Sequence, residues 1–252
     1  MKQKIVLTVA IVVATALAAW GGYVYCTQAQ IEGMNALYIR IPTYIVLVVL
    51  CAITDEMLHE GAHFTVGTLL NMGVKLPKLS FFRSSSVEIN PKGVKALRAR
   101  FVLTAGAGLF LDLIMIALGT VALAVPTVSP IYCAFLPYAT YTFIMNVAPL
   151  EYSSGKTDGL VIAEALSNSD SSKVMFAVLH VQGLINSGTP LKEVDENLLF
   201  DVPQIQEDDV NFIILTQLRY EYYIANGDEA NAQKYFDRYN DLTQYLPEGY
   251  RK

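Results

Sequence analysis

Long apolar runs separated by short polar links fill the first 150 residues, and this pattern predicts membrane-spanning helices. Each run is long enough to cross a bilayer, which requires about 20 apolar residues. The runs cover about residues 5–26, Tyr44 to Leu70, Phe101 to Val125, and Pro130 to Leu150. The sequence therefore predicts an all-α membrane protein with about four transmembrane helices.

The first apolar run has two interpretations. Lys2 and Lys4 precede it and Ala16-Leu17-Ala18 resembles a cleavage site, which is the pattern of a signal peptide. The run continues well past that site, however, and its length favours a retained helix. We predict an N-terminal transmembrane anchor within residues 1–30.

The polar stretch between the second and third runs has a different character. Residues 73–92 alternate loosely, contain Pro77 and end at Asn90-Pro91, which predicts one or two short strands. An exposed edge there could bind an extended peptide by strand addition, whereas the plainer alternative is a basic cytoplasmic loop.

Residues 161–252 consist of amphipathic stretches separated by polar turns, which predicts a soluble helical domain. The last two stretches form a helix–Gly-Asp–helix pattern that resembles a tetratricopeptide unit, with Gly227, Ala232 and Phe236 at the expected offsets. No 34-residue repeat is evident. The hypothesis is that this domain docks a regulatory partner or a substrate tail.

Composition and charge agree with a membrane protein. The chain is 53% hydrophobic and only 16% charged, against about 25% charged in an ordinary soluble protein. Residues 71–100 carry seven Lys or Arg and one acid, whereas residues 151–252 carry 17 acids and 8 bases. This distribution does not predict a nucleic-acid partner. The three cysteines share no metal-ligand spacing, so we expect them to fill core positions.

The second apolar run contains the pattern H-E-x-x-H at His59, Glu60 and His63. Helix positions four apart lie on one face, so both imidazoles can bind a single metal ion, and Glu60 can accept a proton from a water on that metal. The chain has only three histidines, and two of them are here; the third, His180, is expected to be structural or solvated. Ionisable groups inside an apolar run are costly and usually functional. The pattern predicts a zinc site.

Thr54, Asp55 and Glu56 come just before this pattern. The second run is longer than a membrane requires, so a tilt or a break near Thr54 is expected, and these residues could cap a new helix. Alternatively, Asp55 and Glu56 orient the metal ligands from one turn away.

The later spans carry further candidates. Ala105–Gly108 is a run of small residues that lets membrane helices approach closely. Asp112 is an intramembrane carboxylate, which could be a ligand or proton relay or could form a hydrogen bond to a neighbouring helix. The fourth run ends in Asn146-Val147-Ala148-Pro149, and Asp158-Gly159 follows in a Ser/Gly-rich turn. Alone, that turn has ordinary loop chemistry.

Together, H-E-x-x-H in one membrane span and N-x-x-P followed by Asp-Gly at the end of a later one resemble the site-2 protease family of intramembrane zinc metalloproteases, over roughly residues 40–160. The resemblance implies that His59, His63 and Asp158 bind Zn²⁺, that Glu60 is the general base and that Asn146 helps to place the substrate or oxyanion. It also places a membrane-associated β segment at residues 73–92.

One spacing departs from the family. Many members have the aspartate five residues after the proline, whereas Asp158 follows Pro149 by nine. We expect the extra residues to form a local loop that returns Asp158 to the metal, with Asp112 as the reserve ligand. No PDZ-like domain is visible.

The charges predict an orientation. With Lys2 and Lys4 inside, four spans place the basic residues 71–100 in the cytoplasm, as the positive-inside rule expects, and leave both termini cytoplasmic. The expectation is an integral protein of a bacterial cell membrane that cleaves a membrane protein or peptide. An inactive family member acting as a membrane binding or regulatory protein is the alternative, and a metal transporter or sensor has less support because few other soft ligands are present.

Overall fold

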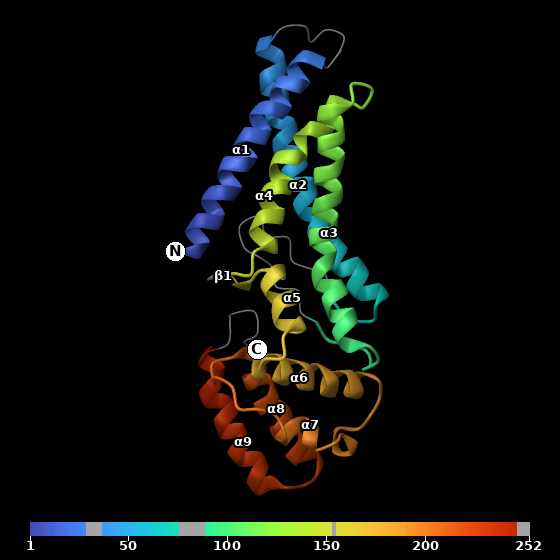
Figure 1. Cartoon of the computed structure of the whole chain (residues 1–252). Coiled ribbons are helices and arrows are strands. Elements are labelled where there is room, and N and C mark those ends of the chain that lie inside the picture. Colours follow the sequence, from blue (N-terminus) through green and yellow to red (C-terminus); the bar gives the residue numbers. More distant parts are fainter. Residues whose placement is uncertain (29–36, 76–88, 153–154, 246–252) are drawn as a thin grey trace. The chain divides into compact units, whose positions relative to one another are not determined.

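The computed structural model describes residues 1–28, 37–75, 89–152 and 155–245, which are mostly helical. The chain forms two compact units, shown in Figure 1. The first is built mainly from Met1–Val66 and Leu103–Ala163, and the second from Gly67–Val74, Glu88–Val102 and Glu164–Lys252.

Three helices of the described chain are long and apolar enough to cross a membrane. They are α1 (Lys2–Gln28), α2 (Leu37–Leu69) and α3 (Leu97–Ala124), with 27, 33 and 28 residues. At a rise of about 1.5 Å per residue, each exceeds the roughly 30 Å of a bilayer's hydrocarbon core. Three of the expected spans are therefore present as helices.

Of the two expectations for the second run, a tilt or a break near Thr54, the break is wrong. Helix α2 runs without interruption through this position, and the Thr54 hydroxyl donates a 2.9 Å hydrogen bond to the carbonyl of Leu50. A threonine hydroxyl that donates to the carbonyl four residues earlier has its hydrogen bond within the helix, so Thr54 does not act as the N-cap of a new helix. Asp55 is therefore an interior helix residue, and its side chain is fully buried.

The fourth expected span stays a prediction. A short 3₁₀ helix, η1 (Pro130–Ala134), leads into α4 (Leu136–Val147), whose 12 residues are fewer than a straight span needs. Two-residue strands β1 (Glu151–Tyr152) and β2 (Gly155–Lys156) then pair antiparallel, and α5 begins at Asp158 and ends at Leu166. The expected β segment at 73–92 falls mostly on residues outside the described ranges.

Among its described residues, the first unit has two small clusters of buried side chains. One joins Tyr25 of α1 to Tyr44 and Cys51 of α2, and the other contains Val24 and Cys133. Helix α1 also packs along α4 (Figure 1). Cys51 and Cys133 are buried and unpaired, so these two fill core positions as predicted.

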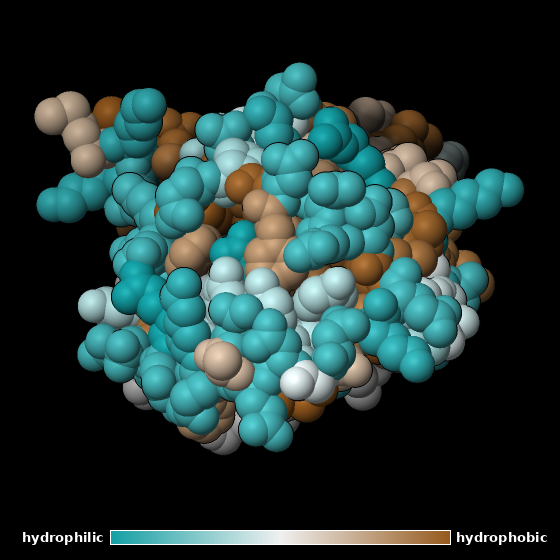
Figure 2. All heavy atoms as spheres, turned by 90° about the horizontal axis from the view of Figure 1, so that it is seen from below, coloured by the Kyte–Doolittle hydropathy of each residue, from teal (hydrophilic) through white to brown (hydrophobic). Residues whose placement is uncertain are grey.

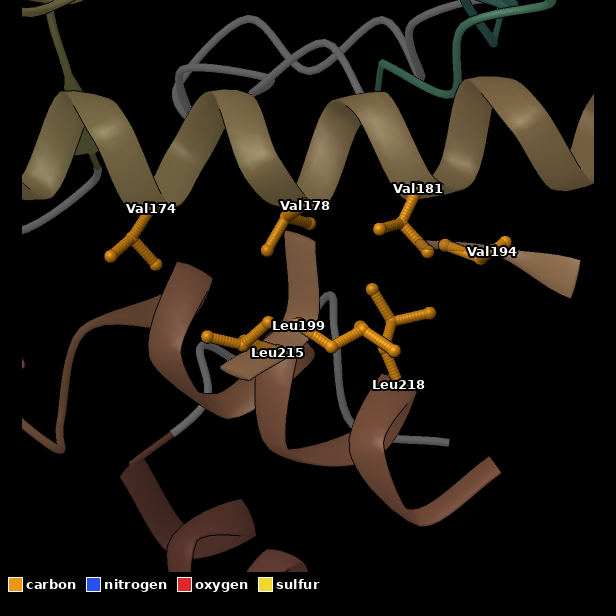
Figure 3. Close-up of a cluster of buried hydrophobic side chains, with 7 residues drawn as sticks. All are labelled: Val174, Val178, Val181, Val194, Leu199, Leu215 and Leu218. Carbon is orange, nitrogen blue, oxygen red and sulfur yellow. The ribbon is translucent and has the colours of Figure 1, made fainter. Parts of the chain in front are cut away.

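The second unit has a conventional aliphatic core. Figure 3 shows valines of α6 (Asp170–Asn186) facing leucines of α7 (Asn197–Phe200) and α8 (Val210–Ala225). The side chains of Ser169 and Asp209 cap the first turns of α6 and α8. Short 3₁₀ helices η2 (Leu191–Glu193) and η3 (Thr243–Tyr245) complete the unit.

Helices α8 and α9 (Glu229–Leu242) form a packed hairpin, with Ala232 buried and Phe236 exposed. This α8–α9 hairpin is the helix pair that the sequence pattern predicts. Its assignment as a tetratricopeptide unit stays a prediction. Hydrophilic residues predominate on the face shown in Figure 2. Among residues 170–245, the exposed large hydrophobic side chains are Ile224, Phe236 and Tyr245.

Candidate metal centre

Helix α2 presents two imidazoles from consecutive turns. His59 and His63 are four residues apart and their side chains are buried, with exposed fractions of 3% and 4%. Their Nε2 atoms are 3.2 Å apart. The helical spacing that the sequence analysis used is therefore sufficient to bring both ring nitrogens to one point.

Asp158 completes this group from the N-terminus of α5. Its Oδ2 atom is 3.3 Å from Nε2 of His59 and 3.3 Å from Nε2 of His63. The β1–β2 hairpin, in which Glu151 pairs with Lys156, accommodates the extra residues between Pro149 and Asp158. The local loop expected from the sequence is thus this hairpin, and it returns the carboxylate to the two histidines.

The residues on either side of Asp158 fix its position. Thr157 is buried, and its one hydroxyl hydrogen is shared between the carbonyls of Ala148 (2.6 Å) and Leu150 (3.0 Å). The same hydroxyl accepts a hydrogen bond from the amide of Leu160 in the first turn of α5. Gly159 lies against the end of α4: a Cβ there would be 2.1 Å from the carbonyl oxygen of Val147. Only glycine permits this approach, which explains the Asp-Gly pair.

The second nitrogen of each imidazole is occupied by an acceptor from α3. His59 Nδ1 is 2.9 Å from Oδ1 of the buried Asp112, and His63 Nδ1 is 2.8 Å from the carbonyl oxygen of Thr104. A carbonyl and a carboxylate only accept, so both Nδ1 atoms carry hydrogen and both neutral rings direct an Nε2 lone pair toward Asp158. Such partners hold metal-binding histidines in one orientation.

Three acceptor atoms therefore converge without a donor among them. Two lone pairs and a carboxylate oxygen within 3.3 Å repel one another unless a cation or added protons lie among them. Added protons on the His59 and His63 rings are one such solution: in that state burial, which raises the pKa of the Asp158 carboxyl, is outweighed by the charged rings, which lower this pKa to about 2. Asp158 is thus ionised at neutral pH, the state in which a carboxylate binds metal.

The dimensions of the group fit a small tetrahedral ion. Ligand atoms about 2.0–2.1 Å from a tetrahedral zinc lie ~3.3 Å from one another. The three separations here are 3.2, 3.3 and 3.3 Å. A His59–His63–Asp158 group can therefore hold a metal ion, and three protein ligands leave a fourth position open.

Gly108 of α3 forms one wall of the centre. A Cβ at this position would be 2.5 Å from Nε2 of both His59 and His63. The small residues at Ala105–Gly108 were expected to permit close approach between helices. At Gly108, α3 approaches α2 closely beside the Nε2 atoms of both histidines. Sequence reasoning missed this contact, because nothing local to α3 indicates which glycine faces the histidines.

The other predicted residues are placed as follows. Glu60 is half-buried beside His59, and Asn146 is in the last turn of α4, with its carbonyl oxygen 3.0 Å from where a Cβ on Gly159 would lie. Asp112 is not a member of the ligand group but the partner of His59. Asp55 is fully buried with no hydrogen-bond partner for either carboxylate oxygen in the described structure.

Comparisons with protein-family models, with curated proteins and with solved structures found no match for this chain.

Proposed function

We propose that this protein is an intramembrane zinc metalloprotease, which hydrolyses a peptide bond within or near a membrane-spanning substrate. The observation that carries the proposal is the convergence of His59 Nε2, His63 Nε2 and Asp158 Oδ2 on one point. Two of these ligands belong to α2, which is long and apolar enough to cross a bilayer. Buried metal-ligating side chains of this kind, with an acidic residue beside them, suit metal-assisted hydrolysis.

Zinc bound at this centre would supply a Lewis acid that polarises a peptide carbonyl and makes a water molecule more acidic. Glu60 would accept the proton of that water, because it lies next to His59 in the helix and three residues before His63. Asp112 and the Thr104 carbonyl keep both imidazoles in the orientation that binds metal. The Asn146 amide would donate a hydrogen bond to the substrate carbonyl as negative charge develops on its oxygen.

A helical substrate hides its carbonyls in backbone hydrogen bonds, so it must unwind locally before Glu60 and its neighbours can act. Lipid offers no partners for the freed backbone groups. The protein must provide them, and the membrane-associated β segment proposed at residues 73–92 would do so by pairing with the unwound strand.

The proposed topology has four spans and both termini in the cytoplasm of a bacterial cell. Only Phe135 separates η1 from α4, and placed end to end the two helices would rise about 28 Å, close to the roughly 30 Å of the hydrocarbon core. They would form the fourth span. The seven basic residues in 71–100 would then lie on the cytoplasmic side. The unit that includes residues 164–252 would dock a regulatory partner.

The test compares wild-type protein with Glu60→Gln against a co-expressed library of single-span peptides. Gln is close to Glu in shape but cannot accept the proton, so the proposal predicts that cleavage is lost while one zinc per chain is retained. Zinc binding without cleavage of any peptide by the wild type would instead favour a binding protein. Cleavage that persists in Glu60→Gln would refute the proposed base.

A further inference from the structure

A groove of about 360 Å³ lies in the first unit between α1, α2 and α4. Its walls include Val49 and Ile53 of α2, Tyr138 and Tyr141 of α4, and Ala14 of α1. Apart from Glu56, every residue that lines it is aliphatic, proline or tyrosine. A cavity of this size accepts a few side chains of a single peptide segment, not a folded domain.

The groove follows α2 toward the candidate metal centre. Val49, Ile53 and Glu56 line it, and their spacing of four and then three residues describes one stripe along a helix. Four residues further along the same stripe is Glu60, the proposed base. A segment lying in the groove would therefore run along the face of α2 that leads to the reacting group.

Glu56 is the acidic residue of this otherwise apolar lining. Its Oε2 accepts a 2.7 Å hydrogen bond from the Tyr138 hydroxyl, the contact that joins α2 to α4 at the groove. A carboxylate has about four acceptor sites, so it can take more donors than this one. An occupant with an amine or hydroxyl would complement Glu56, whereas a lipid acyl chain offers no donor.

We propose that this groove docks a membrane-spanning segment of the substrate, with apolar side chains against Val49 and Ile53 and an amine or hydroxyl side chain at Glu56. The inference rests on the proposed function and specifies where the substrate lies. It makes the groove the element that selects the substrate, while the metal centre supplies the chemistry.

Photocrosslinking tests the position directly. A photoreactive residue is placed at Val49 or at Leu50 of full-length Glu60→Gln protein in lipid nanodiscs, together with single-span peptides. Both residues are 53% exposed, but only Val49 lines the groove. Val49 should crosslink the peptides and Leu50 should not. Equal crosslinking from both positions, or labelling of lipid alone from Val49, would overturn the proposal.

Peptide selectivity tests the charge at Glu56. Two peptides are compared that differ by Lys or Leu at the position facing the groove, and kcat/KM is measured with wild type and Glu56→Gln. The ratio of Lys to Leu peptide should fall roughly tenfold in the variant, as expected for a lost charge-assisted hydrogen bond. An unchanged ratio would contradict the assignment.

The two proposals fail in different ways. If wild-type protein cleaves peptides but Val49 does not crosslink them, the groove assignment is wrong and the protease proposal stands. If Val49 crosslinks peptides in zinc-loaded protein and wild type cleaves nothing, the protease proposal is wrong and the groove is a binding site for membrane segments.

Discussion

Replacing Gly108 with alanine should weaken metal binding severely through a single methyl group. The added Cβ would be 2.5 Å from Nε2 of both His59 and His63, about an ångström inside ordinary contact. The rings cannot turn away freely, because their Nδ1 atoms are held by Asp112 and by the Thr104 carbonyl. At least one metal ligand must therefore leave its position.

The size of the effect follows from comparable perturbations. Losing a residue that merely orients a ligand costs about 10–100-fold in metal affinity. Gly108→Ala displaces a ligand itself, so zinc affinity should fall by at least ~100-fold. Gly106→Ala is the matched control on the same helix, because its Cβ would meet only a side-chain carbon of Ile162, at 3.8 Å. That variant should bind zinc within about threefold of wild type.

The assay is competition between purified full-length protein in detergent and a chromophoric zinc chelator. Far-UV circular dichroism shows whether each variant keeps its helices. Helical Gly108→Ala protein that binds zinc as tightly as Gly106→Ala would refute the position assigned to the metal. It would also refute the argument that the three acceptor atoms meet beneath Gly108.

Three further tests, two of them with a matched control variant, examine the residues around the metal centre and the core of the second unit. Asp112→Ala should weaken zinc binding by about 10–100-fold in the same competition assay, and unchanged affinity would mean that this carboxylate does not hold its histidine. Gly159→Ala should weaken zinc binding, because its Cβ would clash with the backbone of Val147. Gly61→Ala is the control and should bind zinc normally, because its Cβ would meet nothing within 4 Å. Equal zinc affinities of the two variants would contradict this reasoning. In the second unit, Leu215→Ala should lower the free energy of local unfolding by about 2–5 kcal/mol, because Leu215 is only 1% exposed. Ile224→Ala should lower it by less than about 0.5 kcal/mol, because Ile224 is 54% exposed. Amide hydrogen exchange of α8 measures the difference, and similar protection in both variants would refute the assigned core.

The sequence predicted best those features that depend on neighbouring residues. The spacing of His59 and His63 is sufficient to place two imidazoles on one face of a helix. Likewise, the lengths of three apolar runs are sufficient to predict three long helices. The predicted break at Thr54 was wrong because a threonine hydroxyl can bond back to the carbonyl four residues earlier and remain within a helix.

What depends on tertiary contacts was harder to predict. Asp158 was a candidate only through the family resemblance, since its route to the histidines requires the β1–β2 hairpin and the close approach of Gly159 to α4. Asp112 was noticed as an intramembrane carboxylate, but its contact with His59 depends on how α3 lies against α2. No local pattern contains that information.

The most direct test of the metal centre is X-ray absorption at the zinc K-edge, measured on full-length protein purified with bound metal. The account predicts one zinc per chain, with only nitrogen and oxygen neighbours at about 2.0–2.1 Å and the scattering pattern of two imidazoles. Substoichiometric zinc, or a sulfur neighbour at about 2.3 Å, would contradict the assignment of His59, His63 and Asp158 as the ligands.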